Sequence, residues 1–222
     1  MTAGTHSLTA VYSGDRNNPA GTSVPVTVTV SAVPVTLSAS CWNASFSYGG
    51  SYICTVSLSS NAGSVQGALS YAVDAGTPNS IPINNGSAQF SVTTPNAGNH
   101  SVAISYAAQS NFAAAGPVTE SFTVTQAPTQ IQLTPSSYYQ SASAPLTLTA
   151  SLTSWSAGAP KDGTVAFYDG TTSLGTLPAG ATVTLTSSSL SPGSHALTAV
   201  YATGPSGNYA PVTSSAANVQ LH

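Results

Sequence analysis

Hydrophobic and polar residues alternate along most of the chain, in short runs that are separated by turn-forming residues. Residues 26–30 read Val-Thr-Val-Thr-Val, and residues 146–152 follow the same pattern. Such alternation places successive side chains on opposite faces of a β-strand. Asp169-Gly170 follows one of these runs and is typical of a tight hairpin turn. The pattern predicts an all-β fold. In the last third of the chain the expected strands are residues 130–134, 146–152, 164–168, 181–185, 196–201 and 212–221.

One block of sequence recurs three times at a nearly constant spacing. Each copy contains a glycine, a histidine two residues later and a tyrosine six residues after the histidine. The second histidine follows the first by 94 residues, and the third follows the second by 95. A period of this size fits one β-sandwich domain of about 100 residues. The repeated residues are His6 and Tyr12, His100 and Tyr106, and His195 and Tyr201.

The repeat sets the expected domain boundaries. Residues 1–32 carry only the last two strands of a unit, and complete units span 33–126 and 127–222. Val33-Pro34 and Ala127-Pro128 stand at the two joints, where proline restricts the preceding residue to extended conformations. The joints are therefore expected to be short and semi-rigid. The two strands of residues 1–32 should be covered by preceding residues of a longer chain, or alternatively by strands of a second copy.

Charge is nearly absent from the chain, and this excludes several classes of function. Only 3% of the residues are charged, the formal net charge is −3, and Arg16 and Lys161 are the two cations. Nothing in such a composition neutralises the phosphates of a nucleic acid or binds an anionic membrane surface. No apolar run reaches the ~18 residues of a membrane span, so membrane insertion is not expected either.

The two cysteines, Cys41 and Cys54, lie 13 positions apart on either side of a Tyr-Gly-Gly turn. If the flanking runs pair as strands, the two thiols face each other at disulfide distance. A disulfide formed in an oxidising compartment is the first interpretation. A pair of unpaired buried thiols is the alternative.

The last third of the chain resembles a known family. Residues 163–170 read Gly-Thr-Val-Ala-Phe-Tyr-Asp-Gly, Leu-Gly follows at 174–175, and residues 190–201 read Leu-Ser-Pro-Gly-Ser-His-Ala-Leu-Thr-Ala-Val-Tyr. This pattern is similar to the bacterial Ig-like repeat family, group 3 and its relatives. Residues 1–32 match the end of the motif, whereas the middle unit departs more from it and adds the cysteines. The resemblance implies tandem immunoglobulin-like β-sandwich domains from large surface or adhesion proteins, an extracellular or cell-surface location, and neighbouring repeats as partners.

The candidate chemistry of the repeated residues is weak. The histidines could bind metal or sense pH, but they lie about one domain apart and cannot meet at one ion, so a structural role in the turn is expected. The tyrosines are expected to fill the core while the hydroxyl binds a loop. Trp42 and Trp155 would contact a sugar only if exposed. The acidic residues are scattered among different turns and units, so no metal site is expected, and a calcium site at a domain joint is the alternative. They are Asp15, Asp74, Glu120, Asp162 and Asp169.

The sequence therefore predicts a non-enzymatic chain with no catalytic residue, no cofactor and no metal site. Its first interpretation is a structural stalk segment of a bacterial extracellular repeat protein or filament. The alternative is an adhesin-type module that binds a glycan or a surface protein through the loops at one end of a sandwich. A weaker third interpretation is an accessory domain of a secreted hydrolase.

Overall fold

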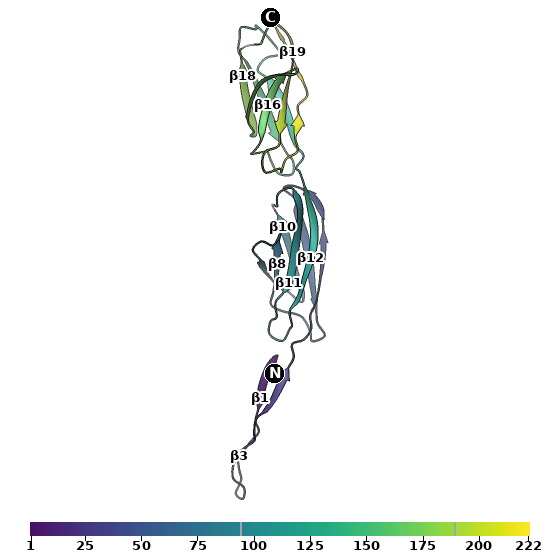
Figure 1. Cartoon of the computed structure of the whole chain (residues 1–222), viewed down its shortest axis with the longest axis vertical. Helices are drawn as coiled ribbons and strands as arrows, with labels where there is room; N and C mark the ends of the chain where they lie inside the picture. Colours follow the sequence, from purple (N-terminus) through teal and green to yellow (C-terminus); the bar gives the residue numbers. More distant parts are fainter. Residues whose placement is uncertain (94, 189) are drawn as a thin grey trace. The chain divides into compact units, whose positions relative to one another are not determined.

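The computed structural model describes residues 1–93, 95–188 and 190–222 of the chain (Figure 1). Its regular elements in that part are 21 β-strands, so the prediction of an all-β fold is confirmed. Among the described residues, no helix has the length and apolar character needed to cross a membrane. The chain forms two compact units, residues 1–42, 53–91 and 101–121 in the first and residues 43–52, 92–100 and 122–222 in the second.

The first 32 residues form two short antiparallel ladders, with His6 opposite Val28 in one and Tyr12 opposite Gly21 in the other. Several apolar side chains here remain exposed, among them Val11 at 75% and Val26 at 59% of their full surface. The closing strand expected at 26–30 is present, whereas the strand expected to lead to Tyr12 is divided into two, and one further short strand was not expected. The strands are β1 (Gly4–Leu8) with β4 (Val26–Val30), and β2 (Val11–Tyr12) with β3 (Gly21–Thr22).

The middle repeat contains a three-stranded and a five-stranded sheet. Alternate residues are buried in the central strand of the three-stranded sheet, residues 51–59, as a strand with one face on a core requires. Aromatic rings from the two sheets stack in pairs, Tyr71 on Phe90 and Tyr52 on Phe122, with centroids 3.9 and 4.4 Å apart. The sheet orders are β10 (Ser87–Thr93), β7 (Ser51–Ser59), β5 (Thr36–Trp42), and β6 (Ser45–Ser47), β12 (Ala115–Thr125), β11 (Gly98–Tyr106), β8 (Ala68–Val73), β9 (Asn79–Pro82).

A three-stranded and a six-stranded sheet pack around one apolar core in the expected third repeat. The core includes Leu148, Phe167, Leu197 and Tyr201, each with none of its surface exposed. One sheet is ordered β13 (Gln130–Pro135), β15 (Leu146–Thr153), β18 (Thr182–Ser187). The other is ordered β14 (Tyr139–Gln140), β21 (Ala217–Leu221), β19 (Gly193–Ala202), β16 (Thr164–Asp169), β17 (Thr172–Pro178), and β20 (Val212–Thr213) also pairs with β19.

The third repeat differs from the expected strands in three places, the first being the two-residue strand β14, which the pattern did not predict. The sequence pattern missed β17, an edge strand with no fully buried residue, because an edge strand of this kind needs no regular hydrophobic alternation. The expected strand at 212–221 is divided at Ser214, whose N–H donates to the Ala199 carbonyl and whose hydroxyl accepts the Ala199 N–H. The predicted domain boundaries at 32/33 and 126/127 stay a prediction.

Candidate functional site

The three repeated histidines bind the backbone of the turn that precedes them. In each repeat Nε2 lies within hydrogen-bond distance of the carbonyl oxygen four residues earlier, that of Thr2, Asn96 and Ser191, at 2.6, 2.8 and 2.8 Å respectively. A carbonyl can only accept, so Nε2 carries the proton in all three rings. The bond fixes the turn before the strand that leads to the repeated tyrosine. A structural role for these histidines remains a prediction that this geometry favours.

His195 makes a second contact that the sequence analysis did not anticipate. Its Nδ1 lies 2.7 Å from Oδ2 of Asp169, and the two side chains are 7% and 25% exposed. The hydrogen bond to Asp169 raises the pKa of His195, and burial of the ring opposes this effect. The carbonyl of Ser191 at Nε2 and the carboxylate of Asp169 at Nδ1 both favour the protonated form of the ring. The contact follows from the antiparallel pairing of β16 with β19, in which Asp169 lies opposite Leu197, two residues after the histidine.

The repeated tyrosines are inserted into the cores of the two complete repeats but not into a core in residues 1–32. Tyr106 and Tyr201 are 1% and 0% exposed, and their hydroxyls donate to the carbonyl oxygens of Gln66 and Asp162. Burial raises the pKa of both phenols. Tyr12 is 47% exposed and donates instead to the carboxylate of Asp15 at 2.6 Å.

The acidic residues do not gather into a metal site. Oδ2 of Asp162 accepts the N–H of Ser206, and Asp169 contacts His195. No group of three or more His, Cys, Asp or Glu side chains placed to hold a metal ion occurs among the described residues.

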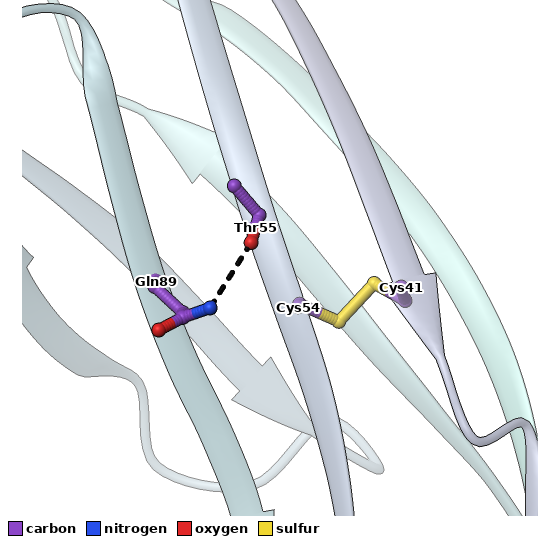
Figure 2. The surroundings of a disulfide bond; sticks show 4 residues. All are labelled: Cys41, Cys54, Thr55 and Gln89. Atoms are coloured by element: carbon purple, nitrogen blue, oxygen red, sulfur yellow. Dashed lines mark hydrogen bonds between the residues drawn. A yellow bond between two sulfur atoms is a disulfide. The ribbon is translucent and has the colours of Figure 1, made fainter.

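Cys41 and Cys54 form a disulfide, as the first interpretation of their spacing predicted (Figure 2). They are direct partners in the antiparallel ladder of β5 and β7, with Cα atoms 4.1 Å apart. Cys54 is fully buried. On the other side of β7, Gln89 of β10 donates a hydrogen bond to the hydroxyl of Thr55. The disulfide therefore joins an edge strand covalently to the central strand of its sheet.

Several aromatic side chains are exposed on the surface of the chain. Trp155 is 77% exposed, in the turn after β15, and Trp42 is 47% exposed at the end of β5. Tyr138 is 58% exposed and lines an open groove together with Gln132 and Asn218. Exposed aromatic rings can stack on sugars, so these positions are the candidates for a binding surface.

Comparison with known proteins agrees with this fold. Residues 131–222 match the family model of the bacterial Ig-like domain (group 3). The crystal structure of invasin, a bacterial integrin-binding protein, is 16% identical with a TM-score of 0.55, over 84% of this chain and 39% of invasin. A tetra-tandem repeat from the extending region of a large adhesion protein is 20% identical with a TM-score of 0.50, over 99% of this chain and 57% of that structure.

These two likenesses show a shared fold. The chain spans less than two thirds of either structure. A comparison with curated protein sequences finds no match. Residues 131–222, which contain the buried motif tyrosine and the Asp-Gly hairpin, are thus similar to the bacterial Ig-like domain of group 3.

Proposed function

We propose that this chain is a structural spacer, a stalk segment of a bacterial extracellular or cell-surface protein. The observation that carries the proposal is that the repeated histidines, and the repeated tyrosines of the two complete repeats, bind the backbone of their own repeat. The rings of His6, His100 and His195 bind the backbone of their own turns, and the hydroxyls of Tyr106 and Tyr201 bind their own loops. The most regular polar residues of the sequence thus maintain the repeat. A segment that adds length requires such residues, whereas catalysis would require them to face a substrate.

The surface chemistry supports the same function. Only 3% of the residues are charged, so the chain depends for its stability on sandwich cores and backbone hydrogen bonds. Salt weakens these interactions far less than it weakens surface ion pairs. The disulfide of β5 and β7 suits the oxidising environment outside the cell. The neighbours in such a protein would be further Ig-like repeats of the same long chain, or other copies in a filament.

The spacer function is tested by displaying the chain on a bacterial surface. One, two or three copies are placed between an unrelated membrane anchor and an epitope, and the height of the epitope above the membrane is measured by fluorescence interference. Height should rise by a constant step for each copy. Gly/Ser linkers of equal residue number are the control, and their height should grow more slowly with length. A height that does not exceed that of the linkers would contradict the proposal.

An adhesin-type module is the second candidate, and exposed Trp155 is the observation that favours it. Its test is binding of the soluble chain to an array of neutral glycans and to host surface proteins. Saturable binding that is lost in Trp155→Ala but retained in Trp42→Ala would identify the loop at 154–158 as a binding site. If the epitope height rises with each copy and the chain binds neither glycans nor host proteins, the spacer function stands.

A further inference from the structure

The residues at the two predicted joints make the same backbone contacts with the repeat that follows them. Val33 follows His6 by 27 residues, and Ala127 follows His100 by 27. The N–H of Val33 donates to the carbonyl of Asn111, and the N–H of Ala127 donates to the carbonyl of Asn208, at 2.7 and 2.8 Å. Val33 forms a parallel β-bridge with Phe112 and Ala127 forms one with Tyr209, and each bridge lies inside one compact unit.

The side chains of the same two asparagines reach a different segment. Oδ1 of Asn111 accepts the N–H of Ala3, and Oδ1 of Asn208 accepts the N–H of Ala97, both at 2.8 Å. Ala3 and Ala97 hold the same place in the repeat, three residues before the motif histidine. One asparagine therefore binds the joint through its main chain and the preceding repeat's turn through its side chain. A loop asparagine that merely stabilised its own turn would bond a residue close to it in sequence.

The second joint contains further contacts within the same unit. Nδ2 of Asn208 donates to Oδ1 of Asn96 at 3.0 Å, and Asn208 is only 4% exposed. The ring of Tyr48 meets the ring of Tyr209 edge to face, with centroids 5.6 Å apart. Such a buried amide with satisfied polar atoms, next to an aromatic pair, has the chemistry of a specific interface.

The third copy of the turn is different in one respect. Pro192 stands where the other two copies have alanine, and proline has no N–H to donate. This turn cannot make the hydrogen bond that Ala3 and Ala97 make, although it keeps the glycine and the histidine of the motif.

We propose that the loop containing Asn111 in the middle repeat, or Asn208 in the third, is a docking surface. We call it the asparagine loop, and its partner is the Ala-Gly-x-His turn of the repeat before it. Asn111 and Asn208 are the residues that select this partner, through the alanine N–H. A repeat whose turn begins with proline, as at Pro192, is a poor partner for this loop. The proposal concerns how repeats recognise one another and holds whether the chain is a spacer or an adhesin.

The test uses the full chain labelled with ¹⁵N, and it measures two quantities. The first is the hydrogen-exchange rate of the Ala97 amide. The second is the alignment tensor of the middle repeat and that of the third, each obtained from residual dipolar couplings. The two tensors differ when the repeats reorient independently. Asn208→Ala removes the acceptor, so the Ala97 amide should exchange at least tenfold faster, and the two tensors should become different as the repeats reorient independently. Asn208→Asp keeps an acceptor oxygen but loses the bond to Asn96, so its effect should be smaller.

A second variant tests the joint from the other side. Ala97→Pro installs the residue that the third repeat tolerates at this position and deletes the donor without touching the asparagine loop. It should make the two alignment tensors different without lowering the melting temperature of the third repeat. Asn218→Ala, on the exposed face of β21, is the matched control and should change neither quantity. Unchanged tensors in both Asn208→Ala and Ala97→Pro, with unchanged Ala97 exchange in the former, would overturn the proposal.

Discussion

The same motif occurs in two very different surroundings, residues 1–32 and the third repeat. In both, a histidine Nε2 binds the carbonyl four residues earlier, and the strand that follows pairs with the closing strand in the same antiparallel manner. Yet Tyr12 is 47% exposed and Tyr201 is fully buried. The motif thus encodes its turn and its hairpin locally, whereas burial of the tyrosine requires the opposite sheet, which residues 1–32 do not contain.

The largest expected effect comes from the two tyrosines. Tyr201→Ala should lower the free energy of unfolding of the third repeat by about 3–5 kcal/mol, because it leaves a cavity in a packed core and removes the bond to Asp162. Tyr12→Ala should change the stability of either complete repeat by less than about 0.5 kcal/mol. Urea unfolding followed by NMR signals of each repeat measures both. A similar loss for both variants would show that the exposed hairpin is coupled to a core.

The middle repeat sharpens the comparison because its sheet has a covalent link that the third repeat lacks. Replacing Cys41 and Cys54 together by serine should destabilise the middle repeat by about 3 kcal/mol, the chain-entropy value for a loop of this size. The third repeat should melt as before. Calorimetry with and without reductant on the parent chain provides the control. Destabilisation of the third repeat by reduction would mean that the two do not unfold independently.

The ion pair of His195 gives the third repeat a pH dependence. Because the folded-state pKa of His195 is raised above its ordinary value of 6.5, this stabilisation is complete below about pH 6.5 and is lost as the pH rises through the folded-state pKa. Asp169→Asn should remove most of it, costing about 1–2 kcal/mol at pH 6 and less at pH 9. The measurement is unfolding of the third repeat at both pH values. An equal loss at pH 6 and pH 9 would contradict an imidazolium.

The smallest effect is expected at Asp15. Hydrogen bonds, first of all from the Tyr12 hydroxyl, lower the pKa of this carboxyl to about 2. Its contribution to the loop is therefore present above pH 4 and is lost as the pH falls through about 2. Carboxyl ¹³C chemical shifts should give that midpoint in the parent chain. In Tyr12→Phe the midpoint should move upward, and an unchanged value would exclude the hydroxyl as the cause.

Much of the fold could be predicted because its signals are local. The alternating run at 146–152 and the Asp-Gly turn after Phe167-Tyr168 each specify their element through neighbouring residues. The edge strand β17 was missed because burial does not constrain its side chains. Cys41 and Cys54 were predicted as partners because a short hairpin brings them together.

The candidate site was less predictable because its contacts are long-range. The bond of Asp169 to His195 depends on the register of two strands, which the sequence pattern did not specify. Asn111 and Asn208 each precede an aromatic residue in a loop, and this local pattern does not indicate their side-chain partners. Their side-chain partners lie 108 and 111 positions away, in the preceding repeat. A comparison of equivalent positions in all three copies would have drawn attention to Pro192.

The disulfide also sets how far the middle repeat extends under tension. When a chain is pulled from its ends, the residues between two bridged cysteines stay out of the force path even after the sheet has come apart. Cys41 and Cys54 enclose 13 residue steps, and a fully extended chain gains at most ~3.3–3.6 Å per residue. The oxidised repeat is therefore roughly 40 Å shorter at full stretch than the reduced one. Of the two complete repeats, the middle one is built to lengthen least.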